Sequence, residues 1–204
     1  MKVLIVYYSK YGHVLKMARA VEKGAAAVGS TEVILRRAPE FAEDLDEIRK
    51  SKHALPVWEE QKDVPECTLD DLREADAVIC VTPTRFGNMI AQMKRIFDGM
   101  AAIWMEGAME GKPTGVFTST STTHGGQETT LLSMMIPLLH LGMILVGVPY
   151  STEGMLHTEG RGGTAYGPTT VAGPDNALNP TPEDLAIAET LGRRVAETAL
   201  KLRG

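Results

Sequence analysis

Three short segments, residues 9–13, 83–88 and 119–126, hold most of the side chains that are able to do chemistry. Each follows a run of apolar, β-prone residues. They read S-K-Y-G-H, P-T-R-F-G-N and S-T-S-T-T-H-G-G, and they combine hydroxyl groups, imidazoles, cations and glycines. Such groups bind an anion or the polar edge of a planar ring. If the apolar runs are strands of one parallel sheet, the segments meet at its carboxyl edge, where such sheets bind ligands.

The first segment predicts a phosphate site. It connects a strand to the N-terminus of a helix, whose free amides and positive dipole end attract an anion. Ser9 adds a hydroxyl group, and Gly12 allows the backbone to approach a ligand closely. An ordinary turn with Ser9 near the N-cap is an equal alternative. Because neither a P-loop nor a G-x-G-x-x-G sequence follows the first strand, a mononucleotide is favoured over a dinucleotide.

The other two segments are compatible with the edge of a planar ring. Arg85 can offer a fork of donors, Phe86 can pack on the ring, and Gly87 permits an unusual backbone turn. Taken alone, a proline turn with a solvated arginine and a core phenylalanine is the more common arrangement. The third segment is dense in hydroxyl donors. It could equally be a flexible linker, although its place between a strand and a helix favours ligand contact.

The rest of the chain supplies the elements that must position these segments. Strands are expected at residues 3–8, 31–35, 77–82, 114–118 and 143–148. Helices are expected at residues 14–28, 43–50, 90–100 and 127–141, and from the Thr181 N-cap to the end of the chain. Continuous apolar strands that alternate with helices predict an α/β fold. With right-handed crossovers, the result is a doubly wound, five-stranded parallel sheet of order 2-1-3-4-5 with helices on both faces.

Two stretches interrupt this pattern. Residues 51–68 are expected to form a surface excursion with at most one turn of helix, because they contain two prolines and little periodicity. Residues 149–180 are rich in glycine and proline and predict a second excursion, after which residues 169–172 can continue the fifth strand. Pro137 is expected to kink or shorten its helix.

Length, composition and charge limit the remaining classes. The 204 residues are 44% apolar, which fits one domain over residues 1–204 and excludes global disorder. With 21 Lys and Arg against 26 Asp and Glu, the net charge of −5 disfavours nucleic acid as a partner. The apolar run at residues 3–8 is too short for a signal sequence, and no stretch is long enough to span a membrane. We therefore expect a cytoplasmic protein.

The cysteines and histidines predict neither a disulfide framework nor a metal site. Only Cys67 and Cys80 are present, and Cys80 lies in a predicted strand, so both are expected to be unreactive in a reducing compartment. His13, His53 and His157 show no spacing typical of metal ligands. No catalytic metal is expected.

Together the segments resemble the flavodoxin-like quinone reductases of the WrbA family, named as tryptophan-repressor-binding proteins and known as NAD(P)H:quinone oxidoreductases. The resemblance covers essentially the whole chain. The matching segments are residues 7–13, 82–89, 125–129, 140–143 and 161–167. The second and the last, T-P-T-R-F-G-N-M and R-G-G-T-A-Y-G, are highly specific in combination, whereas Y-G-H alone is weak.

The resemblance implies bound FMN, with its phosphate at residues 9–14 and its isoalloxazine between residues 83–88 and 119–126. The implied FMN-binding residues are Ser9, Lys10, Tyr11, Gly12, His13, Val14, Pro83, Thr84, Arg85, Phe86, Gly87, Asn88, Ser119, Thr120, Ser121, Thr122, Thr123, His124, Gly125 and His140. Tyr11 is expected in the nicotinamide site, and Trp104 is expected to wall the open face of the ring. Family members form homotetramers with shared active sites, and Trp104 and residues 149–173 are candidates for that sharing.

The implied reaction is a two-electron, ping-pong transfer from NADH or NADPH to the flavin and then to a quinone. Arg85 is expected to stabilise negative charge on the flavin, and His140 to hydrogen-bond or protonate the quinone oxygen. A packed helix position for His140 and a core position for Trp104 are the alternatives. A one-electron carrier and a transcription-factor-binding protein are the alternative functions.

Two departures from related patterns affect these expectations. Flavodoxins place Thr or Ser where Tyr11 and Val14 stand, so we expect weaker flavin retention than in a flavodoxin. The third segment is one residue longer than the family form, which leaves its flavin contacts open within residues 120–124.

Overall fold

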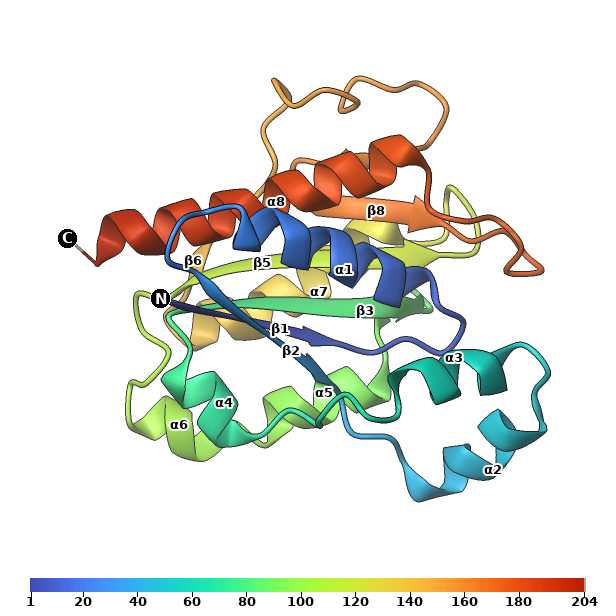
Figure 1. The fold of residues 1–204 in the computed structure, drawn as a ribbon, viewed down its shortest axis with the longest axis horizontal. Helices are drawn as coiled ribbons and strands as arrows, with labels where there is room; N and C mark the ends of the chain where they lie inside the picture. The colour runs from blue at the N-terminus through green and yellow to red at the C-terminus, as the bar shows by residue number, and fades with distance from the viewer. Residues whose placement is uncertain (204) are drawn as a thin grey trace.

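The computed structural model describes residues 1–203, which form one mainly parallel sheet with helices on both faces (Figure 1). The parallel strands are β1 (Lys2–Tyr7), β2 (Glu32–Arg37), β3 (Ala77–Arg85), β5 (Pro113–Thr120), β6 (Ile144–Leu145) and β8 (Gly167–Val171). Two short strands, β4 (Asn88–Met89) and β7 (Gly163–Thr164), pair antiparallel with β3 and β8. The main path runs β2-β1-β3-β5-β8-β7. The predicted order 2-1-3-4-5 is confirmed, with β6 and β8 together in the fifth position.

The fifth strand is divided into these two pieces. β6 pairs with the start of β5, and β8 pairs with its end, at Thr118 to Thr120. The backbone amide of Ala172 then donates to the carbonyl of Thr120 at 2.7 Å. The prediction that residues 169–172 continue the fifth strand is therefore confirmed. Between the two pieces, residues 149–166 form an arm that projects from the body and returns to the sheet through β7 (Figure 1, top).

The helices cover the two faces of the sheet in unequal groups. Their bounds are α1 (His13–Ala26), α2 (Ala42–Lys50), α3 (Ala54–Gln61), α4 (Leu69–Glu74), α5 (Ala91–Asp98), α6 (Ala101–Met105), α7 (Gln127–His140) and α8 (Pro182–Leu202). α1 and α8 bury one face, and α4 to α7 bury the other. Along β1, Val3 and Ile5 enter the first core, while Leu4 and Val6 enter the second. This burial on both faces explains why the strand is continuously apolar.

α1 and α8 lie against each other more closely than side chains would allow. A Cβ atom on Gly24 would stand 1.9 Å from the carbonyl oxygen of Glu189, and one on Gly192 would stand 2.1 Å from that of Val21. Both helices begin near the carboxyl edge of the sheet (Figure 1). This contact therefore fixes the position of one helix N-terminus relative to the other.

Three local predictions were wrong or incomplete. Residues 51–68 contain the eight-residue helix α3 rather than at most one turn, because Pro56 falls in its first turn, where an amide has no intrahelical acceptor. The helix predicted at residues 90–100 is α5, which ends at Asp98, and the short helix α6 that follows Gly99 and Met100 was not predicted. Pro137 does not end α7, which continues to His140 while Met134 and Leu138 keep it on the core. Within residues 1–203, no helix combines the length and apolar character that crossing a membrane requires.

Candidate active site

The three predicted segments converge on a hollow of about 130 Å³ at the carboxyl ends of β1, β3 and β5. It is lined by Ser9, Lys10, Tyr11, His13, Val14, Pro83, Thr84, Arg85, Ser119, Thr120, Ser121, Ala172 and Asn176. All except Val14, Ala172 and Asn176 belong to the three segments, and Val14 directly follows the first. Two of the lining residues, Lys10 and Arg85, are cations, and the described lining includes no carboxylate. The hollow therefore suits an anionic ligand.

The first segment presents the N-terminus of α1 to this hollow. Gly12 adopts a left-handed φ of 92°, which glycine tolerates without steric cost. The Ser9 hydroxyl oxygen accepts hydrogen bonds from the amides of Gly12 and Leu15, both at 3.2 Å. Ser9 thus caps the helix, as the alternative interpretation proposed. The amides of His13 and Val14, in the first turn, have no intrahelical acceptor and remain available to an anion.

α3, which the sequence analysis missed, supports this segment from below. The side-chain amide of Gln61 donates to the carbonyl of Ser9 at 2.6 Å, and Gln61 is buried. Val57 lies 3.4 Å from the position that a Cβ atom on Gly12 would take. On α2, Glu47 forms an ion pair of 2.8 Å with Lys10. The two helices after β2 therefore hold the first segment in place. One of them, α3, lies within residues 51–68, whose sequence shows little helical periodicity.

The second segment is the tip of a β-hairpin. Thr84 and Arg85 of β3 pair with β4, and the two residues between them, Phe86 and Gly87, have φ values of 52° and 75°. Two consecutive positive φ values are typical of the type I′ hairpin turn. Phe86 is 105% exposed, so its expected alternative as a core residue is wrong. A non-glycine residue held in this strained conformation with its ring in solvent is typical of a functional position.

The third segment lies directly against the second. A Cβ atom on Gly126 would stand 2.7 Å from the Cα atom of Gly87. The hydroxyls of Thr84 and Thr130 are 2.7 Å apart, which ties the hairpin to the first turn of α7. Thr120 is anchored by donating to the carbonyl of Thr122 at 2.8 Å. The two segments therefore form one continuous wall. Residues 121–124 are exposed to solvent, and Gly125 is partly covered.

His13 closes the hollow on its inner side. The side chain is buried, and this burial lowers the pKa of His13 below its usual value of 6.5, although backbone groups of Leu178 and Asn176 act in the opposite direction. A neutral imidazole at neutral pH follows. Leu178 and Asn176 belong to residues 172–180, which we call the closing segment. This segment supplies Ala172 and Asn176, the two lining residues that the sequence analysis missed.

The structure does not bring His140 and Trp104 to the hollow. They line a separate depression of about 600 Å³ together with Asn88, Lys94 and Ile136. His140 is the last residue of α7, whereas the third segment adjoins its first residue, and a helix of this length spans about 20 Å. Both side chains are exposed, Trp104 by 55%, so the alternatives of a packed histidine and a core tryptophan are wrong.

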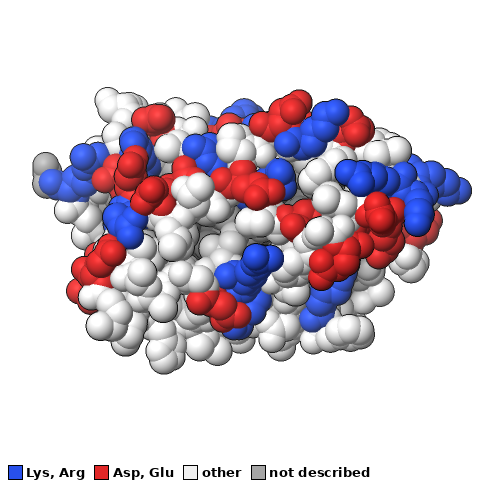
Figure 2. Space-filling view, turned by 90° about the horizontal axis from the view of Figure 1, so that it is seen from below, with Lys and Arg blue, Asp and Glu red and all other residues white. Residues whose placement is uncertain are grey.

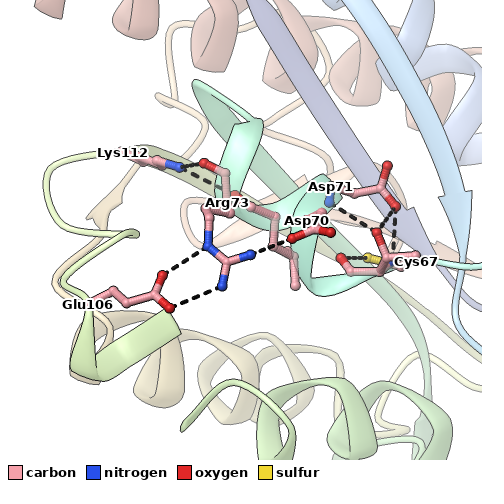
Figure 3. A network of polar contacts seen from close by, with 8 residues as sticks. Cys67, Asp70, Asp71, Arg73, Glu106 and Lys112 are labelled. Atoms are coloured by element: carbon pink, nitrogen blue, oxygen red, sulfur yellow. Dashed lines mark hydrogen bonds and ion pairs between the residues drawn. The ribbon is translucent and has the colours of Figure 1, made fainter. Parts of the chain in front are cut away.

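A polar network holds the short helix that carries Trp104 (Figure 3). Arg73 donates to both carboxylate oxygens of Glu106, at 2.9 and 3.1 Å, which fixes the C-terminal end of α6 on α4. Lys112 donates to the carbonyls of Leu72 and Arg73 at the end of α4, at 3.3 and 2.7 Å. Burial lowers the pKa of the Lys112 ammonium group. α6 is therefore anchored although its outer surface is exposed.

That outer surface is part of an apolar area. The exposed large apolar residues on and beside α6 and α7 are Trp104, Met105, Leu132, Ile136, Leu139 and Ile144. Figure 2 shows the side of the molecule formed by the lowest helices of Figure 1, where charges of both signs are spread over most of the surface while its lower margin is nearly free of them. Exposed apolar areas of this kind are typical of protein interfaces.

The sheet order and the hollow at its carboxyl edge define a flavodoxin-like protein. The family model described as NADPH-dependent FMN reductase matches residues 1–156. The chain is 49% identical to an NAD(P)H dehydrogenase (quinone) of Syntrophobacter fumaroxidans over 99% of this chain and 98% of that protein. It is 48% identical to an NAD(P)H dehydrogenase (quinone) of Solidesulfovibrio magneticus over 100% of both. The chain belongs to the NADPH-dependent FMN reductase family.

The solved structures agree on the fold. A flavodoxin described as a WrbA-like protein from Agrobacterium tumefaciens aligns with a TM-score of 0.66 at 24% identity over 98% of each chain. Flavodoxin 1 of Bacillus cereus aligns with a TM-score of 0.61 at 15% identity over 97% of this chain and 98% of that one. The predicted resemblance, the flavodoxin-like fold and the prediction of an oxidoreductase enzyme are thereby confirmed.

Proposed function

We propose that this chain is an FMN-dependent NAD(P)H:quinone oxidoreductase with a two-electron, ping-pong mechanism. The observation that carries the proposal is the hollow at the N-terminus of α1, which is lined by the first turn of that helix, with the free amides of His13 and Val14, and by Lys10 and Arg85, while Glu47, the ion-pair partner of Lys10, lies outside the lining. This donor set fits a phosphate monoester. FMN, the flavin that carries such a group, matches the family description and would supply the hydride-accepting and hydride-donating chemistry.

The proposed FMN contacts follow from the shape of the site. The hollow of about 130 Å³ is smaller than the usual ligand pocket of about 300–1,000 Å³, so it has room for a phosphate and polyol chain but not for a flavin ring. Residues 9–14 would hold the phosphate. The hairpin tip and residues 119–125 would hold the ring at the rim, where Phe86 is free to cover it.

Arg85 is proposed to act at the polar edge of the ring. Its guanidinium donates to the carbonyl of Thr84 at 3.0 Å, which keeps the charged group beside the rim. The remaining guanidinium donors are available to stabilise negative charge that develops on the reduced flavin. No other arginine lines the described hollow.

His140 and Trp104 are proposed to act on the site of another subunit. Both residues belong to an exposed apolar area, and His140 lies at the end of α7 that is far from the third segment. A second copy of the chain that covers this area would bring its own site into contact with these two side chains. A homotetramer with shared sites, as expected from the resemblance, provides this arrangement. In it Trp104 would wall the ring, Tyr11 would line the nicotinamide site, and His140 would hydrogen-bond or protonate the quinone oxygen.

Anaerobic stopped-flow absorbance of the FMN-loaded protein tests this function. Mixing with NADH or NADPH should bleach the visible flavin absorption, and benzoquinone should then restore it. Steady-state rates at several fixed quinone concentrations should give parallel double-reciprocal lines. Failure of both donors to bleach the flavin would overturn the proposal. A long-lived one-electron-reduced state during dithionite titration would favour a carrier instead.

Two further predictions from the sequence are retained as proposals. A single domain over residues 1–204 is supported by two cores that pack on opposite faces of one sheet. Quinone and nicotinamide as small-molecule substrates are supported by the names of the full-length relatives. A cytoplasmic location and the absence of a nucleic-acid partner remain predictions from the cysteine content and the net charge.

A further inference from the structure

One buried carboxylate that the proposed reaction does not use connects three parts of the chain. Asp184, in the first turn of α8, is 2% exposed. Its Oδ1 accepts from the amide of Gly162 at 2.7 Å, and its Oδ2 accepts from the hydroxyl of Thr170 at 2.8 Å and from the amide of Thr181 at 3.0 Å. The bond to Thr181 belongs to the helix cap. The bonds to Gly162 and Thr170 have no role in capping.

The two bonds to Oδ2 hold both ends of the closing segment. Thr170 precedes residues 172–180, and Thr181 follows them. The backbone between these two points places Ala172 and Asn176 in the wall of the hollow, against the first segment. Because both ends of the segment meet at one carboxylate oxygen, the position of this wall depends on Asp184.

The bond to Oδ1 holds the arm. Gly162 lies near the end of residues 149–166, and two residues earlier Gly160 packs on the third segment. A Cβ atom on Gly160 would stand 2.3 Å from the Cγ2 atom of Thr123. Elsewhere in the arm Met155 is buried in the core, whereas Leu156 is 79% exposed. Asp184 therefore helps to fix the end of the arm, where Gly162 lies, next to a segment that is proposed to bind the flavin.

We propose that Asp184 is a positioning residue of the cofactor site. Its carboxylate sets the closing segment against the first segment and the arm against the third, and it thereby raises the affinity for FMN without touching the ligand. This inference rests on the proposed function for its ligand. We call the three hydrogen bonds that the Asp184 carboxylate accepts from Gly162, Thr170 and Thr181 the clamp. The clamp is a property of the polypeptide alone, so it is measurable without FMN.

Trypsin gives a direct measure of the clamp. Arg161 is the only lysine or arginine between Lys112 and Arg193, so cleavage there gives fragments of residues 1–161 and 162–204. The Arg161 side chain is exposed, while the nitrogen of the bond to be cut belongs to Gly162 and donates to Asp184. The protease therefore needs this hydrogen bond to open before it can bind the chain in an extended conformation.

The experiment compares the full-length wild type with Asp184→Ala and Asp184→Asn. In the absence of FMN, we expect the alanine variant to be cut at Arg161 at least tenfold faster than the wild type, as read by intact mass. With FMN, we expect its Kd, from quenching of flavin fluorescence, to rise at least tenfold. The asparagine variant keeps one acceptor oxygen for Gly162 but places an NH₂ group opposite the Thr181 amide, so both effects should be smaller.

Thr181→Ala is the matched control. It removes the hydroxyl that accepts from the Asp184 amide at 3.1 Å, and it leaves all three donors to the carboxylate in place. A helix cap is lost while the clamp remains. We expect this variant to lower the midpoint of thermal unfolding, with the cleavage rate at Arg161 and the FMN Kd within twofold of the wild type.

The outcomes separate the possible failures. Equal cleavage rates and equal FMN affinity in the wild type and both Asp184 variants would overturn the inference. It would also be overturned if Thr181→Ala changed the cleavage rate and the FMN Kd as much as Asp184→Ala does, because Asp184 would then act only as part of the helix cap. If Asp184→Ala does not fold, Asp184→Asn and Thr170→Val, which removes one donor, decide the question by the same two readings. Absence of FMN binding by the wild type would instead refute the proposed function, and the cleavage rates would still test the clamp.

Discussion

Replacing Gly126 with alanine tests whether contact between the second and third segments builds the site. The left-handed φ of 87° at Gly126 costs an L-residue about 1–2 kcal/mol. The new Cβ atom would also meet the Cα atom of Gly87 at 2.7 Å, and overpacking of this kind costs about 1–3 kcal/mol. The lower entropy of the unfolded variant offsets about 0.4–1 kcal/mol. We therefore expect a loss of about 3 kcal/mol, since all three terms apply together.

Gly111→Ala is the matched control for this substitution. Gly111 also has a positive φ, of 73°, but no atom lies within 4 Å of its added Cβ, so only the backbone term and the entropy term apply. We expect this variant to lose about 1 kcal/mol. The free energy of unfolding is measured by urea titration, and the FMN Kd by fluorescence quenching. Gly126→Ala should weaken FMN binding at least tenfold, because the added methyl group separates the second segment from the third. Gly111→Ala should not change FMN binding.

Two results would refute this reasoning. If Gly126→Ala and Gly111→Ala lose equal stability, the close contact between Gly126 and Gly87 carries no energetic weight. If Gly126→Ala loses stability but binds FMN as the wild type does, the junction of the two segments supports the fold and not the ligand.

Three other predictions concern groups around the site. Burial lowers the pKa of His13, so the imidazole binds a proton more tightly in the unfolded chain than in the folded one, and the free energy of unfolding should fall as the pH drops below about 6.5. In urea titrations at pH 5 to 8, His13→Asn should remove this pH dependence, and an unchanged pH dependence would contradict the prediction. Burial raises the pKa of Cys80 to about 12, and partial burial beside Asp71 raises the pKa of Cys67, so neither thiol should react with iodoacetamide in the native protein at pH 7.5; rapid modification, read by intact mass, would contradict this. Arg73→Ala should leave the midpoint of urea unfolding close to that of the wild type, because the Glu106 pair is solvent-exposed, while a clear drop of the midpoint would mean that the pair carries the packing of α6.

The sequence allowed much of the site to be predicted because its residues are local to strand ends. Ser9, Thr84 and Ser119 each follow an apolar run, and the carboxyl ends of parallel strands meet at one edge. Gly87 indicated an unusual backbone turn in the same way, because glycine adopts a positive φ without steric cost, although the hairpin itself was not predicted. For these positions, short-range pattern and fold topology together are sufficient.

The missed residues depend on contacts between distant parts of the chain. Gln61 supports Ser9 from a helix whose proline and two glutamates resemble a loop sequence, and Asp184 resembles an ordinary capping residue until the positions of Gly162 and Thr170 are known. The exposure of His140 and Trp104 was not predictable either. Their neighbours along the chain are apolar, and only the packed structure shows which side of α6 and α7 faces outward.

The central claim is that the N-terminus of α1 binds the phosphate of a flavin, and parallel titrations of the apo-protein with FMN and riboflavin test it most directly. The two ligands share the ring and differ in the phosphate. A hydrogen bond to a charged group contributes about 1.5–3 kcal/mol, so one such bond predicts that FMN binds at least about tenfold more tightly than riboflavin. Equal quenching curves for the two flavins, or no quenching by either, would contradict the account.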